Sequence, residues 1–394
     1  MVTINNNSDA KSPVDGICKI LKEVCGNGDI QLHAPIFNGQ ELQYLKRCLD
    51  TTYVSSVGEY VNQFEKEIAK YTDTQYAVAL VNGTSALHLA LLLARVGSGD
   101  EVLVPSLTFI ATANAVKYCG ASPHFVDVDE ETLGISPVAL RDWLGFTAEV
   151  INGHCVNKRT QKRIRAIIPM HAFGHPADMQ GILSVAADYK LKVIEDAAEA
   201  LGSKYYGKHV GSFGDMGVFS FNGNKIITTG GGGAIVTNNA ELAQRARHMS
   251  TTAKKSHPWK FEHTEVAYNY RLPNINAALG CAQLEQLPTF IRSKRELFTL
   301  YQHRFNALGG LSIKAEPKNC NSNYWLQTLI LEPQNTSYRD EIIQKTNEIG
   351  LMTRPAWSLL HRHPFYDKCP KAELSVSEKI ESQIISIPSS ANIS

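Results

Sequence analysis

Residues 191–202 read LKVIEDAAEALG, and this stretch decides how the rest of the chain is interpreted. Leu191 begins an apolar run of strand length, and Glu195 and Asp196 follow at its carboxyl end. Ligands of open α/β sheets bind at the carboxyl ends of the strands. Asp196 is therefore placed where its carboxylate can face a ligand, although an aspartate in this position can also cap the next helix.

Helical and strand-like segments alternate around this stretch. We expect helices at residues 41–49, 60–71, 85–94, 111–119 and 179–189. Short apolar strands are expected at residues 76–81, 101–105, 123–126, 166–169 and 192–194. This alternation indicates an α/β protein with a mostly parallel sheet and helices on both faces. Beyond it, a long helix is expected from residue 275 to about 308, then a strand at 324–331 and a helix at 337–349.

A second motif, SFNGNK at residues 220–225, ends in Lys225, twenty-nine residues after Asp196. The glycine run 230–233 follows closely, and glycine allows the backbone to approach a ligand. A solvated lysine at the end of a strand seldom has such neighbours. A lysine that bonds to an aldehyde and a carboxylate that keeps a ring nitrogen protonated are what pyridoxal phosphate needs from a protein. Asp196 and Lys225 together therefore point to pyridoxal phosphate chemistry.

The phosphate of such a cofactor needs an anion site, and residues 76–94, YAVALVNGTSALHLALLLA, predict one. A buried strand runs into a glycine turn with two hydroxyl groups, and a helix follows. Free N–H groups and the positive end of the helix dipole then converge on an anion. Thr84 and Ser85 are the expected phosphate ligands, although N-capping alone would also explain a Gly-Thr-Ser sequence before a helix.

Six motifs in a fixed order carry a family resemblance. They are NGTSAL (82–87), TFIAT (108–112), HAFG (171–174), EDAA (195–198), SF to Lys225 (220–225) and YNYRL (268–272). From about residue 30 to 394, the chain resembles the pyridoxal phosphate-dependent sugar-nucleotide aminotransferases of the DegT type. The resemblance implies the fold-type-I aminotransferase architecture, with a large cofactor-binding domain and a smaller C-terminal α+β domain. We expect an N-terminal extension at 1–30, disordered over about its first twelve residues, the large domain at 31–274, and a bridging helix with the small domain at 275–394.

The same resemblance implies roles for individual residues. Lys225 would bond to the cofactor and later move protons, and Asp196 would pair with the pyridine nitrogen. Glu199 would lie near the phenolic oxygen, where a carboxylate is repulsive unless it is protonated or turned away. The other implied cofactor ligands are Phe109 on the ring face, Gly83, Thr84, Ser85 and Ser220 at the phosphate, and Asn269 from the second subunit of a homodimer. The implied substrate ligands are Ser56, Asn224, Arg271 and Arg354.

Lysine at position 225 favours amino transfer, because related sugar dehydratases have histidine there. L-glutamate is the expected amino donor. The LHAP and NG motifs at 32–35 and 38–39 and the NGNKIITT motif at 222–229 resemble enzymes that aminate the C4 ketone of a UDP-linked 4-keto-6-deoxy-N-acetylhexosamine, as in legionaminic acid and bacillosamine pathways. The alternatives are a GDP- or dTDP-linked 4-keto-6-deoxysugar of the perosamine type, a pyridoxal phosphate lyase with Cys320 as its reactive thiol, and a non-catalytic regulator on the same scaffold.

Composition limits the other partners. The 394 residues carry a formal net charge of +1, which gives no electrostatic basis for binding nucleic acid or an anionic membrane. Eight cysteines show no metal-ligand spacing with histidine, so we expect no metal site and a reduced, cytoplasmic chain. Residues 1–12 are polar and apolar stretches are short, so neither a signal peptide nor a membrane span is expected.

Overall fold

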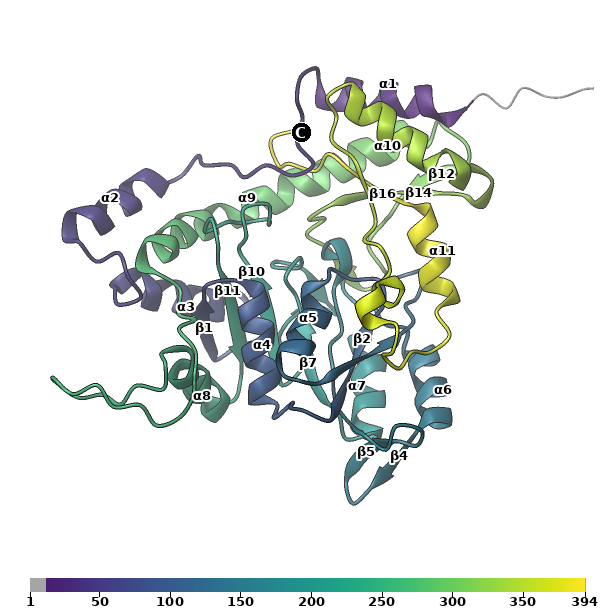
Figure 1. Cartoon of the computed structure of the whole chain (residues 1–394). Coiled ribbons are helices and arrows are strands. Elements are labelled where there is room, and N and C mark those ends of the chain that lie inside the picture. The colour runs from purple at the N-terminus through teal and green to yellow at the C-terminus, as the bar shows by residue number, and fades with distance from the viewer. Residues whose placement is uncertain (1–11, 394) are drawn as a thin grey trace, which may run out of the picture.

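The computed structural model describes residues 12–393, so the expectation for the first eleven residues lies outside the described part of the chain. Two sheets dominate the architecture, a large one in the lower half of Figure 1 and a small one near the top. The long helix α9 (Asn274–Phe305) runs from one to the other, close to where the sequence predicts it. The α/β class and the two-part fold-type-I arrangement are confirmed.

The large sheet has nine strands, in the order β1-β11-β10-β7-β6-β2-β3, with β5 paired to β6 and β4 paired to β5. Their bounds are β1 (Tyr76–Leu80), β2 (Asp100–Pro105), β3 (Ser122–Val126), β4 (Ala148–Ile151), β5 (His154–Asn157), β6 (Arg163–Ile167), β7 (Lys192–Asp196), β10 (Met216–Ser220) and β11 (Gly233–Thr237). Strands β10, β7, β6, β2 and β3 are parallel neighbours, whereas β11 runs antiparallel to both β10 and β1. The sheet is therefore mixed and mostly parallel.

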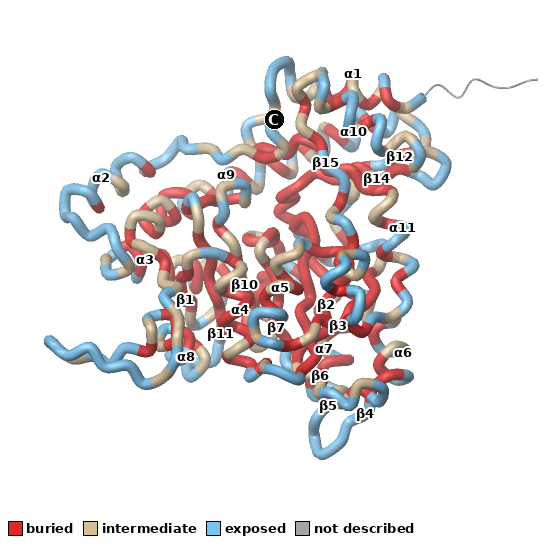
Figure 2. The backbone as a smooth tube through the Cα atoms, in the orientation of Figure 1, coloured by how far each residue is buried: buried red, intermediate tan, exposed pale blue. Residues whose placement is uncertain are grey.

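Helices cover both faces of the large sheet, and its strands form the buried centre of the molecule in Figure 2. The helices of this part are α2 (Glu41–Thr51), α3 (Glu59–Tyr71), α4 (Gly83–Leu93), α5 (Ala111–Tyr118), α6 (Pro137–Thr147), α7 (Met179–Asp188) and α8 (Ala240–Ser250). Val193 packs into the hydrophobic cluster that includes α3, α6 and α7, and Ile194 into the cluster under α4, α5 and α8. Because side chains alternate along a strand, Glu195 and Asp196 point to opposite faces of the sheet.

The small sheet has the order β12-β14-β16-β15, with β12 (Leu311–Ile313), β14 (Gln327–Leu331), β15 (Arg354–Pro355) and β16 (Ile384–Ile387). Helices α1 (Pro13–Cys25), α10 (Arg339–Glu348) and α11 (Ser375–Gln383) surround it. Helix α1 packs its apolar side against α9 and α10, so part of the expected N-terminal extension lies on this small domain. The strand expected from residue 324 begins only at Gln327, because Tyr324 has a left-handed backbone (φ 48°).

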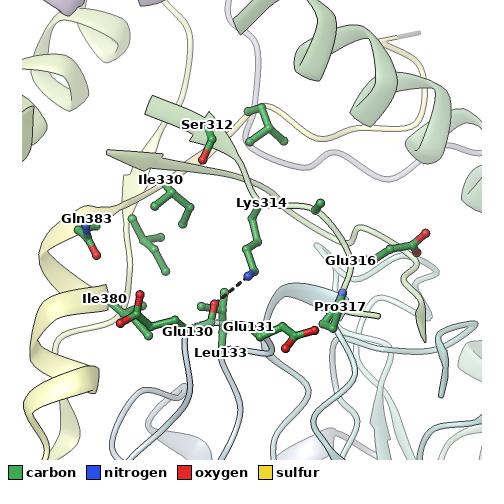
Figure 3. Close-up of a pocket in the computed structure, with 13 residues that line it drawn as sticks. Glu130, Glu131, Leu133, Ser312, Lys314, Glu316, Pro317, Ile330, Ile380 and Gln383 are labelled. Carbon is green, nitrogen blue, oxygen red and sulfur yellow. Dashed lines mark hydrogen bonds between the residues drawn. The ribbon is translucent and has the colours of Figure 1, made fainter. Parts of the chain in front are cut away.

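A short third sheet, β13-β8-β9, ties the two parts together by pairing β13 (Cys320–Asn321) with β8 (Lys204–Tyr205), which in turn pairs with β9 (Lys208–His209). Elsewhere along the seam, Lys314 donates to the carbonyl of Glu130 at 2.8 Å beside a cavity of about 330 Å³ (Figure 3). That cavity is lined by the turn at 130–133 and by side chains of the small domain, and Lys225 and Asp196 are not among its lining residues. Of the helices described, none is long and apolar enough to cross a membrane.

Candidate active site

Lys225 lies in the loop that follows β10, at the carboxyl edge of the large sheet. Its side chain is only 13% exposed. The Nζ atom is 3.3 Å from Oε1 of Glu199 and 3.9 Å from the centre of the Trp325 ring. The amine is thus held between a carboxylate from the large domain and an aromatic face from the segment that leads into β14.

Asp196 is the last residue of β7, as the sequence predicts for the strand that ends in a carboxylate. Its Oδ2 accepts a hydrogen bond from the hydroxyl of Thr112 at 2.7 Å, and its Oδ1 accepts one from the N–H of Ala198 at 3.2 Å. Burial raises the pKa of the Asp196 carboxyl, although these donors and the charge of Lys225 counteract it. A buried carboxylate with only two hydrogen-bond donors can still accept a further one, so Asp196 is suited to pair with a protonated ring nitrogen.

Glu199 lies beyond Asp196 on the same loop and is fully buried. Its Oε2 accepts from the backbone N–H of Phe173 at 2.8 Å, while Oε1 faces Lys225. Burial raises the pKa of the Glu199 carboxyl to about 7, with Lys225 opposing the shift and Asp196 adding to it. A pKa in this range lets Glu199 carry a proton near neutral pH, and a protonated carboxyl would not repel a phenolate.

The predicted anion site is built at the start of α4. Asn82 caps this helix by accepting from the N–H of Ser85 at 2.7 Å, so the cap residue precedes the Gly-Thr-Ser sequence. Gly83 adjoins Ser220 at the end of β10, because a Cβ on Gly83 would lie only 3.0 Å from the Cβ of Ser220. Close approach of these two backbones brings the hydroxyl of Ser220 to the positive end of the α4 dipole, where a phosphate binds favourably.

Phe109 ends the loop between β2 and α5, and its side chain is 53% exposed despite being large and apolar. Its carbonyl accepts from the N–H of Thr112, the residue that holds Asp196. An exposed aromatic ring fixed one turn from the Asp196 partner fits the stacking role that the resemblance implies. The amine, the carboxylate, the aromatic ring and the anion site together fit pyridoxal phosphate.

The roles of the remaining predicted ligands stay predictions. Asn269 is exposed and bridges to Thr251, and Ser56 lies in the loop before α3. The guanidinium of Arg271 pairs with Glu65 and donates to the Ala79 carbonyl at 3.2 Å. Arg354 donates to Asn347 on α10, and the carbonyl of Asn224 accepts from Trp325.

Three residues at the site were not assigned a role from the sequence: Thr112, Trp325 and His33. Thr112 stands in a quoted motif, so helical spacing from Phe109 could have indicated it. Trp325 and His33 come from segments far away in sequence, and only the fold brings them to Lys225. The His33 ring is buried, and burial lowers its pKa well below the ordinary value, with Lys294 and Lys225 adding to the effect.

Cys320 is unsuited to the reactive-thiol role of the lyase alternative. It is buried in β13, paired to Tyr205, and burial raises the pKa of its thiol to about 12. A reactive cysteine needs a lowered pKa and access to substrate.

Comparison with known proteins identifies the family. The profile of the DegT/DnrJ/EryC1/StrS aminotransferase family matches residues 35–394. A GDP-perosamine synthase of Escherichia coli O157:H7 is 40% identical over 339 residues, covering 86% of this chain and 87% of the relative. A GDP-perosamine synthase of Caulobacter vibrioides is 37% identical over 365 residues, covering 92% and 94%. The crystal structure of the aminotransferase TlmJ from Streptoalloteichus hindustanus superposes with a TM-score of 0.82 at 27% identity, covering 92% of this chain and 93% of the other. The chain belongs to the DegT/DnrJ/EryC1/StrS aminotransferase family and is a pyridoxal phosphate-dependent sugar aminotransferase.

Proposed function

We propose that this enzyme transfers the amino group of L-glutamate to the C4 ketone of a GDP-linked 4-keto-6-deoxyhexose, in the manner of a perosamine synthase. The observation that carries the proposal is the similarity to three GDP-perosamine synthases, from Escherichia coli, Caulobacter vibrioides and Vibrio cholerae, at 40%, 37% and 33% identity. These relatives favour the GDP-sugar alternative over the UDP-linked N-acetylhexosamine expected from the motifs at 32–39 and 222–229. We therefore propose the GDP-linked alternative in place of the UDP-linked sugar as the main interpretation.

Each part of the site has a task in amino transfer. Pyridoxal phosphate, when bound, supplies a ring that accepts the electron pair released at the reacting carbon. Asp196 would keep the ring nitrogen of the bound cofactor protonated, and the Lys225 amine would take up and return the proton at the reacting carbon. Thr84, Ser85, Ser220 and the first turn of α4 hold the phosphate. Glu199, whose pKa is raised to about 7, would lie near the phenolic oxygen, where its protonated form would not repel a phenolate.

A substrate panel tests the nucleotide and the sugar. The enzyme is given L-glutamate and, in turn, GDP-, dTDP- and UDP-linked 4-keto-6-deoxysugars, with and without an N-acetyl group, and kcat/KM is measured for each. Products are identified by mass and by proton coupling constants. We expect the GDP-linked sugar to have the highest kcat/KM by at least about tenfold, a difference of roughly 1.4 kcal/mol in transition-state binding. A higher kcat/KM for the UDP-linked N-acetyl sugar would overturn the proposal, and Lys225→Ala serves as the inactive control.

We also propose a homodimer in which Asn269 binds the phosphate in the partner's site. Asn269 is exposed and lies between Tyr268 and Tyr270, whose rings stack with centres 4.9 Å apart. This aromatic support gives an exposed amide a fixed position. Mixing Lys225→Ala with Asn269→Ala chains should restore activity, because each hybrid dimer holds one intact site. Confirmed subunit exchange with activity no higher than the sum of the two variants would contradict sharing.

A further inference from the structure

The environment of Lys225 has a feature that amino transfer alone does not explain. Its Nζ atom is in contact with both Glu199 and the face of Trp325, and the side chain is largely excluded from water. An aromatic face attracts an ammonium ion through its quadrupole, and this attraction grows when the ion is desolvated. The Lys225 amine therefore lies between two groups that can each interact favourably with an ammonium ion, the Trp325 face and the ionised Glu199 carboxylate.

Trp325 is fixed in position by bonds on every polar group. Its indole N–H donates to the carbonyl of Asn224 at 2.7 Å, so the ring is anchored to the residue just before Lys225. Its backbone N–H donates to Oδ1 of Asn323 at 2.8 Å. Its carbonyl accepts from the buried amine of Lys294 at 3.0 Å. The ring face is thus held where the lysine amine can meet it.

Glu199 and Trp325 are also tied to each other by two routes. The Asn323 amide donates to the carbonyl of Glu199 at 2.9 Å while accepting from Trp325. Phe173 donates its N–H to Glu199 at 2.8 Å and accepts from the N–H of Leu326 at 3.3 Å. These bonds connect the loop that carries Glu199 to the segment that carries Trp325.

Gly174 shows how closely this frame is packed. A Cβ at position 174 would lie 1.9 Å from Oδ1 of Asn323, and the residue has φ of +96°. Glycine is required there on both counts. The HAFG motif at 171–174 thus supports the frame around Lys225.

We propose that Trp325 and Glu199 form a resting site for the protonated Lys225 amine, which the lysine occupies whenever it is not bonded to the cofactor. Trp325 is a positioning residue in this assignment. Other charged or titratable groups that face Lys225 are Asp196 at the end of β7 and His33 from the N-terminal segment. Asp196 adds negative charge, and His33 is neutral because its pKa is well below the ordinary value. The small domain thereby helps to release the lysine.

The resting site should weaken the binding of pyridoxal phosphate but not that of pyridoxamine phosphate. Bonding of Lys225 to the aldehyde of pyridoxal phosphate would release the aldehyde oxygen and two of the ammonium protons as water, so the nitrogen would no longer be a free ammonium ion. Interactions made only with the free lysine oppose that bond. Pyridoxamine phosphate leaves the lysine free, so the resting site does not affect its binding. Removing the aromatic face should tighten binding of the aldehyde form and leave binding of the amine form unchanged.

The test measures the Kd of cofactor-free enzyme for pyridoxal phosphate and for pyridoxamine phosphate separately, by absorbance and fluorescence. In Trp325→Leu we expect the Kd for pyridoxal phosphate to fall roughly five- to thirtyfold. The Kd for pyridoxamine phosphate should change less than about twofold. Trp325→Phe, which keeps an aromatic face, is the matched control and should retain a Kd ratio close to that of the wild type. Parallel weakening of both cofactor forms in Trp325→Leu would overturn the proposal.

Two further variants keep the test decisive. Glu199→Gln, measured at pH 8, above the Glu199 pKa of about 7, removes a negative charge beside Lys225 while keeping an oxygen for the Phe173 N–H. It should shift the Kd ratio in the same direction, which covers the case in which Trp325→Leu does not fold. In a Lys225→Ala background, Trp325→Leu should no longer change the ratio. A persistent shift there would refute the resting site. The inference rests on Lys225 being the cofactor-bonding lysine, and a Lys225→Ala chain that binds pyridoxal phosphate as tightly as the wild type would refute that assignment separately; neither result depends on which sugar is the substrate.

Discussion

Two adjacent carboxylates at the end of β7 lie in contrasting regions of the molecule. Glu195 points to the face covered by α7, where it accepts from the N–H groups of Gly211, Phe213 and Gly214 at 2.6, 2.7 and 2.8 Å and pairs with His171 at 3.2 Å. Asp196 points to the face covered by α5 and has two donors, Thr112 and Ala198. Both side chains are buried, so the difference lies in how many partners each carboxylate has.

The different partners shift the pKa values of the Glu195 and Asp196 carboxyl groups in opposite directions. Burial alone would raise the pKa of the Glu195 carboxyl, but His171 and the backbone donors outweigh it and hold the pKa below its ordinary value. Burial prevails at Asp196 and raises its pKa. A carboxylate with a full set of donors holds the 211–214 loop in place, whereas one with few donors keeps the capacity to bind a cationic ligand. We therefore infer that Glu195 stabilises the 211–214 loop, and we propose that Asp196 binds the cofactor.

We expect the largest effect on catalysis from Asp196→Asn. A neutral amide no longer favours the protonated ring nitrogen, so we expect kcat to fall about a hundredfold or more, since each pKa unit is worth about 1.4 kcal/mol. The thermal midpoint of the cofactor-free enzyme should stay unchanged or rise, because a buried charge with few partners has been removed. Normal transamination by this variant would reduce Asp196 to a structural cap.

Glu195→Gln is the matched variant one residue away. A glutamine amide has one oxygen for four donors, so its NH2 group would face N–H groups that lose their acceptor. We expect the free energy of unfolding to fall by about 3 to 4 kcal/mol, from two unsatisfied buried donors at roughly 1 to 3 kcal/mol each. In protein that remains folded, kcat should stay within a fewfold of the wild type. Urea titration and steady-state kinetics on the same preparation separate the two effects, and unaltered stability would remove the distinction between the two carboxylates.

Only part of this region could be predicted from the sequence. The strand ending in Glu195 and Asp196, the helix after Asn82, and the family were all predicted, because strand patterns and motifs are local signals. Only the family resemblance distinguished Asp196 from Glu195. The strand pattern does not, since the donors at 211–214 and the hydroxyl of Thr112 meet the two carboxylates only in the fold. For the same reason, Trp325 was placed inside a strand, and its contact with Lys225 was missed.

Glu199 should make the stability of the protein depend on pH, because its pKa of about 7 exceeds the usual value for glutamate. As pH rises, the unfolded chain loses the Glu199 proton at about pH 4.3, whereas the folded protein keeps it until about pH 7. The free energy of unfolding therefore falls between about pH 4.5 and 7. Above about pH 7 this loss stays constant. Glu199→Gln abolishes it. We expect the variant to match the wild type near pH 4.5 and to gain up to about 3 kcal/mol over it at pH 8 in cofactor-free enzyme. Equal pH dependence of the two thermal midpoints would show that Glu199 is ionised at neutral pH in the folded protein.

The smallest expected effect comes from removing one of the two Asp196 donors with Thr112→Val. Valine has nearly the shape of threonine, so packing around α5 is kept while the hydrogen bonds of the hydroxyl to Asp196, at 2.7 Å, and to the Thr108 hydroxyl, at 3.1 Å, are lost. A hydrogen bond to a charged group contributes about 1.5 to 3 kcal/mol, but the Ala198 N–H and the bound ring nitrogen remain, so we expect kcat to fall only about fivefold. Because Thr112 lowers the pKa of Asp196, the acid side of the kcat/KM profile should move to higher pH in this variant. Thr112→Ser restores the hydroxyl and should restore the profile. A rate loss in Thr112→Val without any movement of the profile would mean that Thr112 supports α5 and does not tune Asp196.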